Sequence, residues 1–302
     1  MLPQGHAAHP AHRGRLTGER RSAAAPLGVF DSGLGGLTVA RALLQALPNE
    51  RIIYLGDTAR VPYGTRSSQT VVRYARGCSE LLIERGVKGI VVACNTVSAV
   101  AIDILRAELD LPIIGVIEPG ARAALAAVSS LKTEKAPKIG VLGTTGTVAS
   151  GAYPRAVGQL STRYEVVALA APLLVPLTEE GWIEGEVPRL IVRRYVEPLI
   201  AAGASVIVLG CTHFPLLKGL IAEAAAELAG HPIPIVDSAE ATAAVVAEWI
   251  ADERLAPTTS QVAPERQLEL LVTDLPASFS VVAGRFLGGD ASQATQVDLV
   301  AK

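Results

Sequence analysis

The chain has 302 residues, half of them hydrophobic, and a formal net charge of −2 at pH 7. No apolar stretch reaches the roughly 18 to 20 residues needed to cross a bilayer, so we expect no membrane association. Three cysteines are too few for a disulfide framework. The composition therefore favours a globular α/β protein of the reducing cytoplasm.

Residues 1–26 differ in composition from the rest of the chain. They contain four arginines and three of the five histidines, but only one acidic residue, Glu19. They also lack the apolar core of a signal peptide. We interpret them as a disordered basic extension. The remaining chain is net acidic and has no basic stripe, so we do not expect it to bind nucleic acid.

Short apolar runs alternate with helical patterns along the rest of the chain. Aliphatic, β-branched runs that end at Gly are typical of buried parallel strands. The predicted strands are 27–30, 52–55, 89–93, 113–117, 139–142, 166–169, 206–209 and 233–236. The predicted helices are 67–85, 98–108, 188–202, 216–228 and 239–252. This alternation predicts right-handed crossovers and a doubly wound sheet.

The two halves of the chain repeat one another. LGVFDSGLGG at Leu27 matches IGVLGTTGTV at Ile139, and LPIIGV at Leu111 matches IPIVDS at Ile233, at offsets of 112 and 122 residues. Such matched spacing indicates two similar structural units. Neither half need fold alone, because the last strand of one could join the sheet of the other.

The repeat places a thiol at the end of one strand in each half. Cys94 follows VVA, and Cys211 follows IVLG. Ligands of open parallel sheets bind outside the carboxyl ends of the strands, so both thiols are expected to face one cleft. A position before a helix N-terminus is expected to favour the thiolate.

Four chemistries could use these thiols. Two general bases on opposite faces of one carbon account for both. A single nucleophile with a base and an oxyanion hole leaves one thiol unused. A metal site of Cys94, Cys211 and His213 lacks the usual ligand spacing, and a redox disulfide lacks a CxxC motif. We favour the two bases.

The segment DSGLGG, residues 31–36, lies between a predicted strand and a helix. Its glycines allow close backbone approach, as in anion-binding loops. It is neither a GxGxxG fingerprint nor a P-loop, and Asp31 would repel a phosphate. We expect the backbone amides and Ser32 to hold a small carboxylate or amine, while Asp31 orients a charge or a base. A helix N-cap role for Asp31 is the alternative.

Six motifs occur in an order and spacing that resemble a known family. They are DSGLGGLTV, GDTARVPYG, ACNT, GTTGTVASGAY, PLLVPLTEEG and GCTHFP, between about Leu27 and Ile250. The chain resembles the bacterial glutamate racemases of the aspartate/glutamate racemase superfamily. The resemblance implies that Cys94 acts on D-glutamate and Cys211 on L-glutamate, with neither PLP nor metal.

The resemblance also implies roles for residues around the thiols. Asp31 would assist Cys94, while Glu179 and His213 would assist Cys211. Glu180 is adjacent to Glu179, so a surface-helix role remains open for either, as does a structural role for His213. The implied substrate-binding residues are Asp31, Ser32, Tyr63, Gly64, Asn95, Thr96, Thr144, Thr147, Thr212 and His213. Loop anchoring is the alternative for the tyrosine, and helix capping for the threonines.

We therefore predict an α/β fold of two pseudo-symmetric lobes, with mostly parallel sheets flanked by helices and the active site in the cleft between them. The first lobe would comprise residues 27–116 and 232–254, the second residues 117–231, and 255–302 a C-terminal extension. Ala171 departs from family members that carry Cys there. The family implies a homodimer that supplies D-glutamate for peptidoglycan; an aspartate-specific racemase or a regulator that binds a gyrase-type partner is the alternative.

Overall fold

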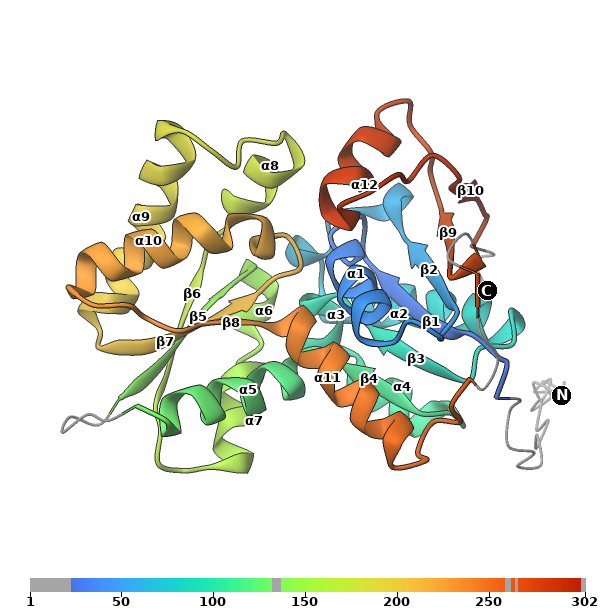
Figure 1. Ribbon diagram of the computed structural model, residues 1–302, viewed down its shortest axis with the longest axis horizontal. Helices are drawn as coiled ribbons and strands as arrows, with labels where there is room; N and C mark the ends of the chain where they lie inside the picture. Colours follow the sequence, from blue (N-terminus) through green and yellow to red (C-terminus); the bar gives the residue numbers. More distant parts are fainter. Residues whose placement is uncertain (1–22, 132–136, 259–261, 264–265, 300–302) are drawn as a thin grey trace, which may run out of the picture.

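The computed structural model describes residues 23–131, 137–258, 262–263 and 266–299, so most of the predicted extension 1–26 lies outside the described residues. The chain forms two α/β lobes side by side (Figure 1). One lobe is built on a six-stranded sheet and the other on a four-stranded sheet. All strand pairings among the described residues are parallel, as predicted.

The two sheets share one topology. The first has the order β10-β9-β2-β1-β3-β4 and the second the order β6-β5-β7-β8, so β1 to β4 correspond to β5 to β8. The strands are β1 (Leu27–Asp31), β2 (Ile52–Gly56), β3 (Gly89–Val92), β4 (Ile113–Gly115), β5 (Lys138–Gly143), β6 (Val166–Ala170), β7 (Ala204–Gly210), β8 (Ile235–Asp237), β9 (Leu268–Val272) and β10 (Thr295–Gln296). The predicted two-lobed, pseudo-symmetric α/β fold is confirmed.

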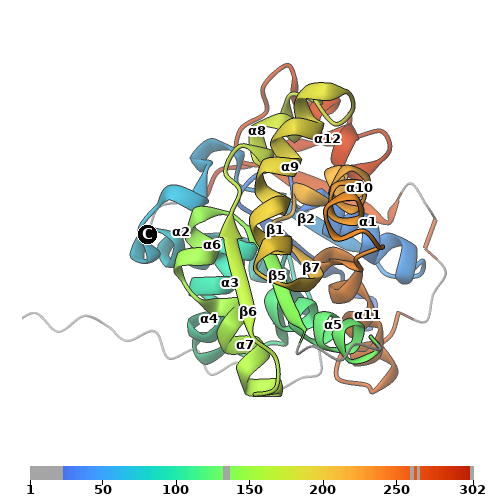
Figure 2. The same ribbon diagram turned by 90° about the vertical axis from the view of Figure 1, so that its left-hand side faces the viewer.

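Helices cover both faces of each sheet, and Figure 2 shows the second lobe with its sheet and helices nearest the viewer. They are α1 (Leu37–Ala46), α2 (Ser68–Glu84), α3 (Asn95–Val100), α4 (Ile102–Glu108), α5 (Ile117–Ser129), α6 (Thr145–Ala149), α7 (Ala152–Leu160), α8 (Leu174–Glu179), α9 (Glu186–Ala201), α10 (Lys218–Ala229), α11 (Ser238–Ala251) and α12 (Phe279–Leu287). In α2, buried residues recur every three or four positions, at Val71, Ala75, Cys78 and Leu82. This period gives the helix one apolar face for the sheet.

The last predicted strand of the second half belongs to the second lobe, which corrects the boundary at residue 231. β8 pairs with β7, with Ile207 opposite Ile235 and Val208 opposite Val236. The chain returns to the first lobe only with α11, which packs against α1 as well as α5. The physical reason is the repeat itself: β8 extends the edge of the second sheet as β4 extends that of the first.

The segment predicted as a C-terminal extension is largely part of the first lobe. β9 pairs with β2 over its whole length, from Leu268 opposite Ile52 to Val272 opposite Gly56. Without β9, the backbone groups along that edge of β2 would be unpaired. Phe286 of α12 is fully buried in the same core as α1. The prediction failed because β9 and α12 have no counterpart in the repeat.

A buried ion pair ties the start of this segment to the first lobe. Lys88 Nζ lies 2.6 Å from Glu50 Oε2, and these side chains are only 2% and 4% exposed. The same ammonium donates hydrogen bonds to the Ala256 carbonyl oxygen at 2.6 Å and the Thr258 hydroxyl at 3.2 Å. Removing one member of such a pair leaves a buried charge without compensation.

We expect Lys88→Met to lower the free energy of unfolding by about 3–5 kcal/mol, because Glu50 would remain buried without its cation. The matched control is Lys218→Met, which removes an ion pair to Glu240 whose side chains are 36% and 65% exposed. That change should cost at most about 1 kcal/mol. Urea denaturation of the three proteins measures both values, and equal stabilities for the two variants would contradict the assignment.

Candidate active site

Both cysteines lie where the repeat predicted them, at the carboxyl ends of equivalent strands. Cys94 follows β3 and is the N-cap residue of α3, and Cys211 directly follows β7. They are 5% and 4% exposed. The two lobes thus bring one buried thiol each to the site between them.

Cys94 is held as a neutral thiol at neutral pH. Burial, together with the charge of Asp31, raises its pKa to about 12, and hydrogen bonding with Ser32 and the Val97 amide only partly opposes this. The thiol donates to Ser32 Oγ over 3.4 Å. The expectation that the helix N-terminus would favour the thiolate is therefore wrong for Cys94, because desolvation outweighs the helix terminus.

Asp31 lies beside Cys94 with one oxygen free. Its Oδ2 accepts a hydrogen bond from the Gly33 amide at 2.9 Å. Its Oδ1 is buried and has no hydrogen-bond partner among the described residues. Burial raises the pKa of Asp31, although the charge of His213 and nearby backbone amides act to lower it. The N-cap residue of α1 is Gly36, so the alternative N-cap role for Asp31 does not hold.

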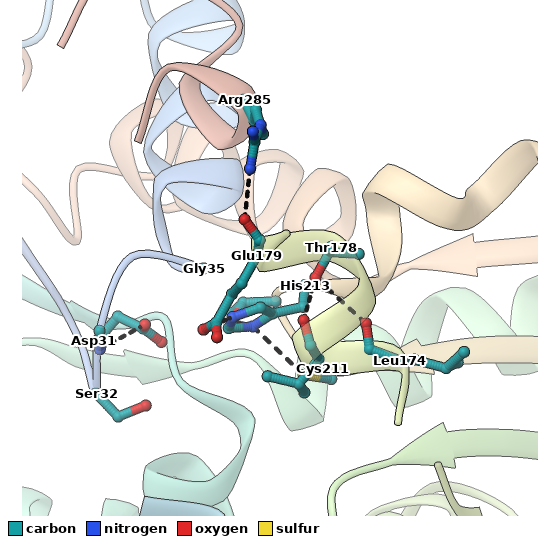
Figure 3. Close-up of polar contacts among 12 residues, drawn as sticks. Asp31, Ser32, Gly35, Leu174, Thr178, Glu179, Cys211, His213 and Arg285 are labelled. Carbon is teal, nitrogen blue, oxygen red and sulfur yellow. Dashed lines mark hydrogen bonds and ion pairs between the residues drawn. The ribbon is translucent and has the colours of Figure 1, made fainter. Parts of the chain in front are cut away.

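Cys211 has a different set of partners, drawn in Figure 3. His213 Nδ1 lies 3.8 Å from the Cys211 sulfur, and His213 Nε2 lies 2.9 Å from Glu179 Oε1. Glu179 rather than Glu180 is thus the histidine's partner. Burial lowers the pKa of His213, but the hydrogen bonds to Cys211 and Glu179 outweigh it and raise the pKa to about 10. The resulting imidazolium can donate to a Cys211 thiolate.

The glycine-rich loop of the first lobe, residues 31–36, contacts the residues that follow Cys211. The single hydroxyl hydrogen of Thr38 is shared between the Thr212 carbonyl oxygen at 3.0 Å and the Gly35 carbonyl oxygen at 2.9 Å. A Cβ atom at Gly35 would lie 2.4 Å from Thr212 Oγ1 and 2.5 Å from the His213 ring. Only glycine therefore permits this approach between the lobes.

Three of the predicted threonines form one cluster across the lobes. Thr144 Oγ1 lies 3.0 Å from both Thr96 Oγ1 and Thr147 Oγ1. Thr144 also caps α6 by accepting from the Thr147 amide, so the capping alternative describes part of its role. Gly64 lies against Thr144, since a Cβ there would be 3.2 Å from Thr144 Cβ. These hydroxyls can donate to a carboxylate.

Asn95 is held by a residue that the sequence did not single out. Tyr153, on α7 of the second lobe, donates its hydroxyl hydrogen to Asn95 Oδ1 at 2.8 Å. Asn95 Nδ2 is buried and has no hydrogen-bond partner among the described residues. Buried polar groups are normally paired. A free amide donor here and the free acceptor at Asp31 suit a ligand that carries a carboxylate and an ammonium group.

Tyr63 is the predicted substrate-binding residue whose side chain is already engaged elsewhere. It is 1% exposed, and its hydroxyl donates to a carboxylate oxygen of Asp57. Asp57 also accepts from Arg60 Nε at 2.7 Å and from the Thr273 hydroxyl at 2.9 Å. The Tyr63 side chain therefore anchors its loop, as the alternative role proposed, and a contact of Tyr63 with the substrate stays a prediction.

The two alternatives of a redox disulfide and a metal site can be compared with this geometry. Cys78, Cys94 and Cys211 are all free thiols. Within the described ranges, no three His, Cys, Asp or Glu side chains are grouped as metal ligands would be. In the same ranges, no helix is long and apolar enough to cross a membrane.

Comparison with known proteins gives the family. The Asp/Glu/Hydantoin racemase family matches residues 28–246. The chain belongs to this racemase family. It is 47% identical to a glutamate racemase from Geobacter metallireducens over 91% of this chain and 97% of that one. It is 46% identical, with the same coverage, to a glutamate racemase from Neisseria meningitidis.

Solved racemases share the fold over almost their full length. A glutamate racemase from Bacillus anthracis matches with a TM-score of 0.82 and 36% identity, covering 92% of this chain and 99% of that one. The Francisella tularensis glutamate racemase, solved with D-glutamate, matches with a TM-score of 0.81 and 32% identity, covering 93% and 100%. An aspartate racemase from Picrophilus torridus shares the fold alone, at 16% identity.

Proposed function

We propose that this protein is a glutamate racemase that interconverts L- and D-glutamate by proton transfer between two thiols, without PLP or metal. One observation carries the proposal: equivalent strands end in buried cysteines that have different partners. The curated relatives described above are glutamate racemases, which supports glutamate as the substrate. A homodimer in the cytoplasm that supplies D-glutamate for peptidoglycan completes the proposal.

The partners of the two thiols suit opposite roles in the reaction from L-glutamate. Cys211, as a thiolate beside the His213 imidazolium, removes the α-proton. Cys94, a thiol, then donates its proton to the opposite face of the α-carbon. The reverse reaction begins with Cys94 as the base, with Asp31 beside it. The site excludes water and fixes its dipoles, which stabilises the carbanion-like charge between the two steps.

The remaining polar groups suit the substrate. The free Asn95 amide and the free Asp31 oxygen can bind the α-carboxylate and the ammonium group, respectively. The cluster of Thr96, Thr144 and Thr147 can bind a carboxylate. Because this cluster combines residues of both lobes, closure of the lobes would complete the site around the substrate.

Circular dichroism of the four substrates L-glutamate, D-glutamate, L-aspartate and D-aspartate tests the proposal. The reaction should contain chelator and no PLP. We expect the signals of both glutamate enantiomers to decay to zero while those of aspartate remain. Decay with aspartate alone would make the chain an aspartate racemase, and no decay with any substrate would overturn the racemase assignment. No observation favours a gyrase-type binding role, whose predicted carrier lies mainly outside the described residues.

The approach of Gly35 to Thr212 and His213 gives a further prediction. We expect Gly35→Ala to lower kcat/KM for L-glutamate by about 5- to 150-fold, because an added methyl group forces about 1–3 kcal/mol of overpacking onto the lobe contact. Gly219→Ala, in α10, is the control, since a Cβ there meets nothing within 4 Å. A Gly35→Ala enzyme with the wild-type kcat/KM would show that this contact does not matter for catalysis.

A further inference from the structure

The helix α12 contacts His213 and Glu179, the two residues that act with Cys211. It belongs to the first lobe, and Figure 1 shows it opposite α8 of the second lobe. Phe286 of α12 meets the His213 ring edge-on, with the ring centroids 5.0 Å apart and the planes at 74°. Such an arrangement is the favoured geometry of an aromatic pair. Phe286 is fully buried, so it presents a fixed surface to the histidine.

The neighbouring residue of α12 binds the end of α8. Arg285 Nη1 donates a hydrogen bond to the backbone carbonyl oxygen of Glu179, the last residue of α8 (Figure 3). The last carbonyl groups of a helix lack partners within the helix, and a cation there also interacts favourably with the helix dipole. The Arg285 guanidinium lies against Gly181, where a Cβ would be 2.7 Å from Arg285 Cζ.

These two contacts fix the two members of one hydrogen-bonded pair. Glu179 holds His213 through its carboxylate, yet its side chain is 49% exposed, so its own surroundings constrain it weakly. The Arg285 contact fixes the backbone from which that side chain extends. Phe286 fixes the plane of the ring that the carboxylate meets. Both contacts come from a segment outside the repeat that forms the rest of the site.

We propose that Phe286 and Arg285 are positioning residues for the His213–Glu179 pair, so that the C-terminal segment serves proton transfer at Cys211. Neither residue touches the substrate in this account. The inference rests on the proposed function, because it assigns the pair to the thiol that acts on L-glutamate. It predicts a defect confined to one of the two proton transfers.

The α-deuterium isotope effect distinguishes the two transfers. The two enantiomers are equally stable, so any variant must lose kcat/KM equally in both directions. If proton transfer to Cys211 becomes slow, however, cleavage of the bond between the α-carbon and its hydrogen limits the rate with L-glutamate only. The isotope effect on kcat/KM should then rise for α-deuterated L-glutamate and fall for α-deuterated D-glutamate, because reprotonation at Cys211 and not cleavage of the carbon–deuterium bond limits the reaction from D-glutamate.

Four variants make the test. Arg285→Met retains an apolar stem but loses the donor, and Phe286→Leu retains apolar volume but loses the aromatic edge. We expect each to lower kcat by about 5- to 20-fold, with KM changed less than twofold and the isotope effect raised for L-glutamate alone. Arg285→Lys should recover most of the loss of Arg285→Met. Val281→Ala, at a position of α12 that is 61% exposed, should match the wild type.

The outcomes separate this inference from the proposed function. Wild-type kcat in both Arg285→Met and Phe286→Leu, or isotope effects that rise equally for both enantiomers, would overturn the positioning role. If Phe286→Leu proves unstable in thermal denaturation, Arg285→Met decides alone, because its change leaves the buried core of α12 intact. A wild-type protein that racemises neither enantiomer would instead overturn the proposed function itself.

Discussion

Cys94→Ala and Cys211→Ala should each reduce racemisation of glutamate by about 10²- to 10⁴-fold while leaving the fold intact. Each change removes the proton carrier of one face, and general acid–base catalysis by a positioned group is worth about 10²–10⁴-fold. The loss should affect both directions, since the reaction in either direction needs one thiol as base and the other as acid. Polarimetry or circular dichroism with L- and D-glutamate measures the rates.

The third cysteine provides a matched control for this prediction. Cys78 is also buried and free, but it lies in α2 within the core of the first lobe. Cys78→Ala deletes the same sulfur atom and creates a cavity of similar size, yet it should keep the wild-type kcat. A single Cys94→Ala or Cys211→Ala enzyme that still racemises at the wild-type rate would refute the two-thiol mechanism.

His213→Asn should lower kcat/KM by about 10²-fold, because Cys211 loses the imidazolium that stabilises its thiolate. The effect depends on pH in a definite direction. The pKa of His213 is raised to about 10 in the folded protein. The advantage of the wild type over His213→Asn should therefore be largest at neutral pH and decline as pH rises through about 10, where the imidazolium loses its proton.

Stability should follow the same titration. A group whose pKa is raised on folding contributes stability that is complete below its unfolded pKa, here about 6.5, and lost as pH rises through its folded pKa. The difference in unfolding free energy between the wild type and His213→Asn should thus shrink between pH 6.5 and pH 10. Urea denaturation at these two pH values measures it. A difference that grows with pH would show that His213 is buried in its neutral form.

Local patterns in the sequence predicted most of the fold. Apolar runs such as those before Cys94 and Cys211 are long enough, and bounded clearly enough, to predict buried parallel strands. The repeat then predicted that both thiols occupy equivalent strand ends. By contrast, β9 and α12 could not be predicted, because pairing of β9 with β2 depends on contacts more than 200 residues apart in the chain.

The site was predicted in its residue types and less well in its contacts. Thr96, Thr144 and Thr147 come together as the motifs implied. The spacing of the motifs could not predict the contacts of Tyr63 and Tyr153. These depend on the direction of each side chain, which brings the Tyr63 hydroxyl to Asp57 and the Tyr153 hydroxyl to Asn95. Likewise, the raised pKa of Cys94 follows from burial in the assembled lobes, which a sequence motif does not encode.

Deuterium incorporation during the first few per cent of reaction tests the central claim, that two thiols act on opposite faces of one carbon. L-Glutamate is incubated with the wild-type protein in D2O, the enantiomers are separated, and the α-position of each is analysed by mass spectrometry. We predict that the D-glutamate formed carries deuterium while the remaining L-glutamate keeps its protium. Product that retains protium, or L-glutamate that exchanges as fast as product forms, would contradict the account, because one base would then serve both faces.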